Sequence, residues 1–100
     1  MIESFVEGRV RLRSALLADA ALAEIFSAGL MKIGGVQKVT INPRTNGALL
    51  EYDKTRLPLS VLQQAAALFA RVNELEKLPG GERISALEEI LKELSEVLGG

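Results

Sequence analysis

Three arginines stand at every second position near the start of the chain, within the segment FVEGRVRLRSALL. They are Arg9, Arg11 and Arg13, and the residues between them are the apolar Val10 and Leu12. Because successive side chains of a strand point to opposite faces, this spacing places the three guanidinium groups in one row. Guanidinium groups bind carboxylates and phosphates through paired hydrogen bonds, so the row is a candidate site for an anion or an acidic partner. The alternative interpretation is a solvated strand face whose arginine stems cover apolar neighbours.

The composition excludes several other kinds of site. The chain has 100 residues and contains neither cysteine nor histidine, so it lacks the thiolate and imidazole groups used in soft-metal binding, redox chemistry and proton transfer. We therefore expect no metal site and no cofactor. The formal net charge is -1 and aromatic residues make up 4% of the chain, which disfavours nucleic acid as a partner. No apolar run reaches the length of a membrane span, so we expect no membrane insertion within these residues.

Hydrophobic periodicity predicts the elements that position the arginine row. Alternation predicts one strand over residues 2–13, with Ile2, Val6, Val10 and Leu12 on its inner side. A helix is expected to follow from the capping residue Asp19 to the glycines at 34 and 35. The rest of the chain predicts two strands joined by the turn NPRTNG and two further helices, at residues 36–42, 48–53, 57–77 and 82–98.

This order of elements predicts an α+β fold of the ferredoxin-like, split βαβ type. The sheet is expected to be antiparallel with the order β-α-β-β-α, because the crossover must be right-handed and the hairpin returns beside the first strand. An additional C-terminal helix is expected in place of the fourth strand. We divide the chain into a ferredoxin-like domain at residues 1–78 and an amphipathic helix at 82–98, which packs on the domain or on a partner chain.

Three segments, GRVRLR, IGGVQKVTINPRTNGALLEYD and LPLSVLQQAA, resemble the heavy-metal-associated domain. Metal-binding members of that family carry a Cys-x-x-Cys loop after the first strand, where this chain has RSALLAD. The chain is therefore similar to the cysteine-free branch, which accompanies heavy-metal P-type ATPases and iron-handling membrane systems. The resemblance implies a non-enzymatic interaction or regulatory module in metal transport or iron storage. It also implies a cytoplasmic location, at the cytosolic face of a membrane where a partner or a further segment holds it there, with a metal-transport ATPase as a partner class.

An enzymatic alternative comes from a weaker resemblance to acylphosphatases, which share the split βαβ fold. That parallel makes Arg13 the phosphate ligand and Asn42 the residue that orients water. However, GRVRLRSALL lacks the additional glycines with which that family cradles phosphate through backbone amides. Glu51 and Asp53 lie two positions apart on one predicted strand, and we interpret them as a polar strand end rather than as paired acid and base.

The C-terminal helix is a candidate association surface. Its apolar stripe must be buried against this chain or against a copy of it. The stripe consists of Ile84, Leu87, Leu91, Leu94 and Leu98. A missing fourth strand would also leave the segment 4–13 as an open sheet edge, where the same strand of a second molecule can pair. The sequence therefore predicts a homodimer or a larger assembly.

Overall fold

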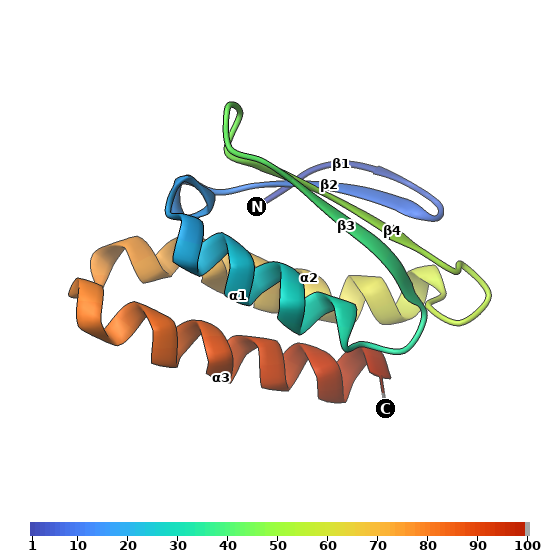
Figure 1. Ribbon diagram of the computed structural model, residues 1–100. Coiled ribbons are helices and arrows are strands. Elements are labelled where there is room, and N and C mark those ends of the chain that lie inside the picture. The colour runs from blue at the N-terminus through green and yellow to red at the C-terminus, as the bar shows by residue number, and fades with distance from the viewer. Residues whose placement is uncertain (100) are drawn as a thin grey trace.

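A four-stranded antiparallel sheet forms one layer of the molecule, and three helices lie on one side of it. The computed structural model describes residues 1–99, and Figure 1 shows the sheet above α1 and α2, with α3 below them. The predicted α+β class with an antiparallel sheet is confirmed. The strands are β1 (Ile2–Val6), β2 (Arg9–Arg13), β3 (Val36–Asn42) and β4 (Gly47–Tyr52), and the α-helices are α1 (Ala20–Met31), α2 (Leu59–Glu74) and α3 (Gly80–Gly99).

The sheet has the strand order β1-β2-β4-β3, and it contains the split βαβ unit that the sequence predicts. Strands β2 and β3 both pair antiparallel with β4, so they run parallel to each other on either side of it. Helix α1 connects β2 to β3 across the covered face. This arrangement is compatible with the ferredoxin-like fold.

The prediction of one strand over residues 2–13 is wrong, because this segment is a hairpin. The chain turns at Gly8, whose φ of +90° is readily adopted only by glycine. Phe5 then lies opposite Val10, and Val6 lies opposite Arg9. A register shift between Ile2 and Ser4 changes the alternation, so Val6 is 67% exposed and does not lie on the inner side as predicted.

The hairpin also corrects the expected place of the fourth strand. Strand β1 lies beside β2 at the edge of the sheet, so the C-terminal helix does not replace a missing strand. The edge of β2 is therefore already covered by the same chain. The expectation that a helix or a second molecule must cover this edge is wrong, and β1 carries the unpaired edge instead.

Local signals set the ends of the other elements close to their predicted places. Asp19 caps α1, because its Oδ1 accepts the backbone N–H of Ala21 at 2.9 Å and that of Leu22 at 3.3 Å. Asn46 has a φ of +55° in the β3–β4 turn, which confirms the predicted hairpin. The predicted second helix ends as a 3₁₀ turn, Leu75–Lys77, and α3 begins two residues earlier than predicted, at Gly80.

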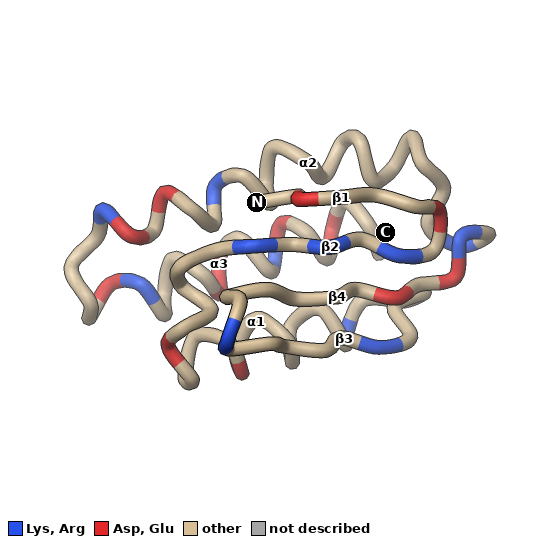
Figure 2. The backbone as a smooth tube through the Cα atoms, turned by 90° about the horizontal axis from the view of Figure 1, so that it is seen from above, with Lys and Arg blue, Asp and Glu red and all other residues tan. Residues whose placement is uncertain are grey.

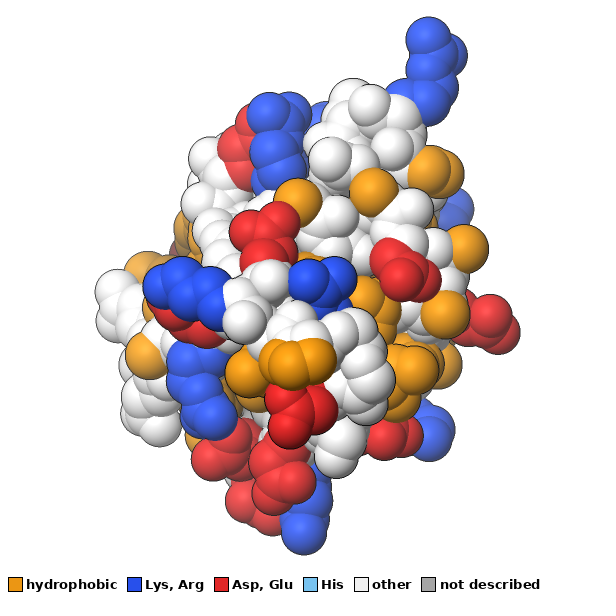
Figure 3. Space-filling view, turned by 90° about the vertical axis from the view of Figure 1, so that its left-hand side faces the viewer, with side chains coloured by type: hydrophobic (Ala, Val, Ile, Leu, Met, Phe, Trp, Pro, Cys, Tyr) orange, Lys and Arg blue, Asp and Glu red, His pale blue; other side chains and the backbone are white. Residues whose placement is uncertain are grey.

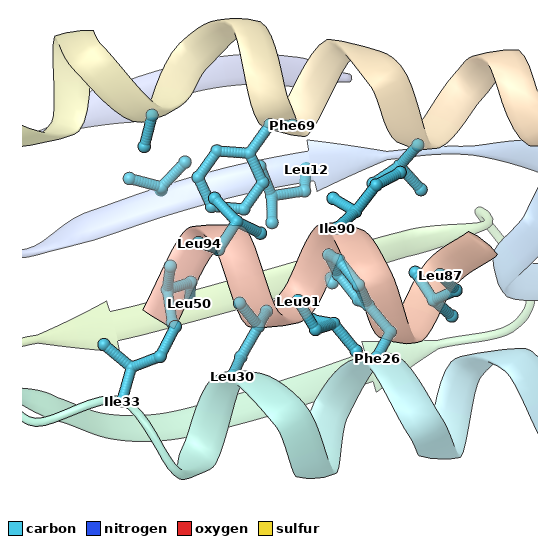
Figure 4. Packing of buried hydrophobic residues seen from close by; sticks show 14 of the residues in the cluster. Leu12, Phe26, Leu30, Ile33, Leu50, Phe69, Leu87, Ile90, Leu91 and Leu94 are labelled. Carbon is cyan, nitrogen blue, oxygen red and sulfur yellow. The ribbon is translucent and has the colours of Figure 1, made fainter. Parts of the chain in front are cut away.

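The third helix completes the hydrophobic core on the side of α1 and α2 that faces away from the sheet. Figure 4 shows side chains of α3 meeting those of α1 and α2, with residues of the sheet in the same cluster. Gly29 on α1 allows the close approach of α3, since a Cβ atom there would lie 2.6 Å from Leu91 Cδ1. The side of α2 that faces away from the sheet is thus covered by α3 of the same chain.

Candidate functional site: the open face of the sheet

The face of the sheet opposite the helices carries the arginine row. Along β2 the exposed residues Arg9, Arg11 and Arg13 alternate with the buried Val10 and Leu12. Figure 2 looks onto this face and shows three basic positions along β2. The structure therefore places the three arginine side chains on one side of a strand, as the sequence predicts.

Two arginines of the row are engaged in ion pairs at the surface. Arg13 Nη2 lies 3.1 Å from Glu3 Oε1 on β1, and Arg9 Nε lies 3.8 Å from Glu51 Oε1 on β4. Within residues 1–99, Arg11 forms no ion pair. It lies between Ser4 and Leu49 on the neighbouring strands. Exposed ion pairs contribute only about 0–1 kcal/mol to the free energy of unfolding. An incoming anion can therefore displace Glu3 or Glu51 from its arginine with little loss of stability.

A shallow depression lies beside Arg11 and Arg13, with a volume of about 430 Å³. We call it the Gly47 hollow, because Gly47 on the central strand β4 contributes no side chain to fill it. Its polar lining comes from β1, β2, β3 and the β3–β4 turn. The side chains with polar groups around it are Glu3, Ser4, Arg11, Arg13, Thr40, Asn42 and Thr45.

Thr40, Thr45 and Gly47 also belong to this site and were not predicted from the sequence. The alternation in VQKVTIN places Thr40 on the same side of its strand as Asn42, which was the available local signal. The strand order β2-β4-β3 was also needed, because it brings that side next to the arginines. Asn42 had been singled out only through the acylphosphatase parallel, and it does share the hollow with Arg13.

The carboxyl group of Asp53 does not have the properties of a general acid. Thr55 donates to Asp53 Oδ1 from its hydroxyl at 2.6 Å and from its backbone N–H at 2.9 Å. The side-chain hydrogen bond from Thr55 is the main reason that the pKa of Asp53 lies below its usual value. A carboxyl group of this kind stays ionised at neutral pH, which agrees with a polar strand end.

The segment that corresponds to a metal loop packs into the core. Residues Ala15–Ala18 form a 3₁₀ turn, in which Leu16 and Leu17 are buried. Ser14 Oγ, itself buried, accepts the backbone N–H of Leu16 at 3.3 Å. Within residues 1–99, no group of three or more histidine, cysteine, aspartate or glutamate residues is placed to hold a metal ion.

Comparison with known proteins assigns the chain to a family. A family model described as heavy metal associated domain 2 matches residues 1–99. The chain belongs to the heavy-metal-associated domain 2 family. Neither the curated proteins nor the solved structures gave a match. The match includes α3, so the C-terminal helix that the sequence analysis separated from the domain lies within the matched region.

The donor groups of this heavy-metal-associated domain do not fit a soft or borderline metal. Such ions prefer thiolate and imidazole ligands, and the chain has neither. In metal-binding members of the family the metal loop follows the first strand, and the corresponding segment RSALLAD of this chain contains the buried Leu16 and Leu17. The only hydroxyl group in this segment belongs to Ser14, and it already accepts a hydrogen bond from the backbone N–H of Leu16. These residues therefore do not support a function through a bound metal ion of this kind.

We expect the purified, untagged domain to show no tight binding of Cu(I) or Zn(II). Carboxylate and backbone oxygens are the remaining ligands, and these favour hard ions over soft ones. Isothermal titration calorimetry checks this expectation. Stoichiometric binding at submicromolar concentration would contradict it and would require a ligand set that the fold does not bring together.

The candidate association helix is largely occupied within its own chain. Four members of its stripe are buried against the core, and Ile84 is 43% exposed. The buried members are Leu87, Leu91, Leu94 and Leu98. Any contact of α3 with a partner would therefore use Ile84 and the charged outer side, unless the core opens.

Charges of both signs occur at one end of the molecule. Figure 3 views the end that faces left in Figure 1, and basic and acidic side chains are intermixed there with hydrophobic ones. This agrees with the nearly balanced composition of twelve basic and thirteen acidic residues. Within residues 1–99, no helix is both long enough and apolar enough to cross a membrane.

Proposed function

We propose that this chain is a non-enzymatic interaction or regulatory module that works without a bound metal ion in a metal-transport or iron-storage system. The proposed partner class is a metal-transport ATPase, met in the cytoplasm at the cytosolic face of a membrane. Membership of the heavy-metal-associated domain 2 family supports the metal context.

The observation that carries the proposal is the uncovered sheet face with Arg9, Arg11 and Arg13. These side chains are exposed, and they stand on a strand that is paired on both sides, with β1 and with β4. A row of guanidinium groups spaced along a strand suits an acidic, extended protein segment, because carboxylates accept paired hydrogen bonds from arginine. We propose that an acidic segment of the partner binds along this face.

The binding proposal predicts that a labelled decaglutamate peptide binds the full chain in a salt-dependent manner. Replacing Arg9, Arg11 and Arg13 together by Gln is expected to weaken binding by about tenfold or more, because charge-assisted hydrogen bonds are lost. Fluorescence anisotropy at several salt concentrations measures both effects.

The matched control replaces three exposed lysines of the helical layer by Gln, namely Lys32 at the end of α1, Lys77 after α2 and Lys92 on α3. It changes the net charge by the same amount but leaves the arginine row intact. We expect a loss of about threefold or less for this control, from long-range electrostatics alone. Equal losses in the two triple variants would show that net charge, and not the arginine face, attracts the peptide.

The alternative function is an acylphosphatase-like phosphate hydrolase. One observation favours it, since Arg13 and Asn42 line the same hollow. Against it, Arg13 is paired with Glu3, and Asn42 Oδ1 accepts the backbone N–H of Arg44 at 3.1 Å. An assay with an acyl phosphate separates the two functions, and turnover that disappears in an Arg13→Ala variant would support the enzyme.

We further propose that the protein is a homodimer joined through β1. This strand is at the edge of the sheet, and Ile2, Phe5 and Val6 on it are exposed. Leu59 at the start of α2 is also exposed and lines the same apolar groove as Ile2 and Phe5. Two copies of β1 can pair antiparallel about a twofold axis, which continues the sheet and removes these side chains from water.

Sedimentation at micromolar concentration is expected to show a dimer. A Phe5→Glu variant is expected to be monomeric, since it places a charge within the strand that would pair. An Ile84→Glu variant is the control, because Ile84 is similarly exposed but lies on α3. A monomeric wild-type chain would refute the dimer.

A further inference from the structure

The Gly47 hollow is built from two rungs of the sheet that face outward, separated by one rung that faces the core. In the first rung Gly47 lies between Arg13 on β2 and Asn42 on β3. In the second rung Leu49 lies between Arg11 and Thr40. Cations thus stand on one side of Gly47 and Leu49, and uncharged polar groups stand on the other. Gly47 adds no side chain between them, whereas the side chain of Leu49 forms part of the lining.

The width of this arrangement suits a small acidic group. Neighbouring strands lie about 4.8 Å apart, so the backbones of Arg13 and Asn42 are separated by about 10 Å. Gly47 places no side chain between them, and the hydroxyl oxygen of Thr45 lies 3.0 Å from the position that a Cβ atom on Gly47 would take. A carboxylate fits between two long cationic side chains and shorter hydrogen-bond donors at this separation.

Groups around the hollow present donors to such an anion. Asn42 Oδ1 already accepts the backbone N–H of Arg44, which leaves the amide NH₂ group of Asn42 as the outward donor. Thr40 adds a hydroxyl, and Arg11 adds a guanidinium group that forms no ion pair within residues 1–99. A site lined by donors favours an acceptor-only ligand, and an ionised carboxylate is one.

Glu3 shows how a carboxylate can occupy part of this site. Its Oε1 lies 3.1 Å from Arg13 Nη2, and Glu3 itself lines the hollow. Both side chains of this pair are about half exposed, at 57% for Arg13 and 45% for Glu3. The pair therefore contributes little stability, and a carboxylate from outside can replace Glu3.

We propose that the Gly47 hollow binds one carboxylate side chain of an acidic protein segment, with Arg11 as the main contact and Glu3 as an internal competitor. This inference rests on the proposed binding of an acidic segment along the arginine row, and it assigns the place on that row where specificity arises. Arg9 lies outside the hollow and is paired with Glu51, so it contributes through charge alone.

The test uses the full chain, a labelled decaglutamate peptide and two pairs of single variants. Arg11→Gln is expected to weaken binding by about tenfold, whereas Arg9→Gln, which removes the same charge from the same strand, is expected to weaken it by about twofold. Glu3→Gln is expected to strengthen binding by about two- to fivefold, because it frees Arg13. Glu51→Gln also removes one negative charge but is expected to change binding by less than about twofold.

A second measurement locates the peptide without any variant. In a heteronuclear NMR titration, the backbone amide signals of Thr40, Thr45 and Gly47 are expected to shift more than those at the Arg9 end of β2. Thermal unfolding of each variant verifies that it retains the fold, which is expected because the four replaced side chains lie at the surface.

Each outcome decides a specific point. No binding of the peptide to the wild-type chain would overturn both the proposed function and the hollow. Binding with equal losses in Arg9→Gln and Arg11→Gln, and with no selective shifts at Gly47, would overturn the hollow but leave the arginine row as the binding face. Displacement of the peptide by inorganic phosphate at micromolar concentration, lost in Arg11→Gln, would show a phosphate site and overturn the carboxylate assignment.

Discussion

A chain that lacks residues 80–100 is expected to lose its cooperative unfolding transition and to aggregate. Helix α3 buries five large apolar side chains against α1 and α2. Burial of each such side chain contributes about 1.5–3 kcal/mol, and the sum is comparable to the whole stability of a small domain, about 5–15 kcal/mol. Removal of α3 would also expose the apolar sides of α1 and α2 that it covers.

Circular dichroism during heating and the binding of a hydrophobic dye measure this effect. The control keeps α3 and replaces Glu89 and Glu96, which are exposed on it, by Ala. The control is expected to unfold cooperatively within about 0.5 kcal/mol of the wild-type chain. A truncated chain that is soluble and unfolds cooperatively would contradict the expectation, and would support residues 1–78 as an independent domain.

Local sequence signals were sufficient for most of the fold. Asp19 caps a helix because its side chain reaches two backbone amides, and Asn46 forms a turn because it tolerates a positive φ. Both effects depend on residues close in sequence. The split βαβ arrangement followed from the order of the elements, since the handedness and shortness of connections leave few alternatives.

The N-terminal hairpin was not predictable in the same way. Apolar residues recur at even positions on both sides of Gly8, at Ile2, Val6, Val10 and Leu12, so a period of two can be followed through the turn and hides it. Glu7-Gly8 also lacks the asparagine or aspartate that marks the commonest two-residue turns. A single glycine within a strand pattern is compatible with a continuous strand or with a turn. In this chain Gly8 lies in a turn, with a φ of +90°.

The candidate site was predictable one strand at a time and not as a whole. Alternation alone placed Arg9, Arg11 and Arg13 on one face. The hollow depends on which residues of β3 and β4 stand opposite Arg11 and Arg13, and this register is set by contacts between distant parts of the chain. The same holds for β1, which brings Glu3 next to Arg13.

Replacing Leu94 by Ala is expected to lower the free energy of unfolding by about 2–5 kcal/mol. Leu94 is fully buried, with 0% of its surface exposed. It belongs to the cluster in Figure 4 that joins α3 to the rest of the core, so its removal leaves a cavity between elements that cannot easily close. Urea denaturation followed by circular dichroism measures the change.

Ile84→Ala on the same helix is the matched control. Ile84 belongs to the same predicted stripe but is 43% exposed, so we expect a loss of less than about 1 kcal/mol. Alanine favours a helix at both positions, and the difference between the variants therefore reports burial. If the stripe instead served a partner chain, the loss in Leu94→Ala would vary with protein concentration, because dissociation would be coupled to unfolding. A loss that is the same at all concentrations would place Leu94 in the core of its own chain, and the exposed edge of β1 would remain the proposed dimer contact.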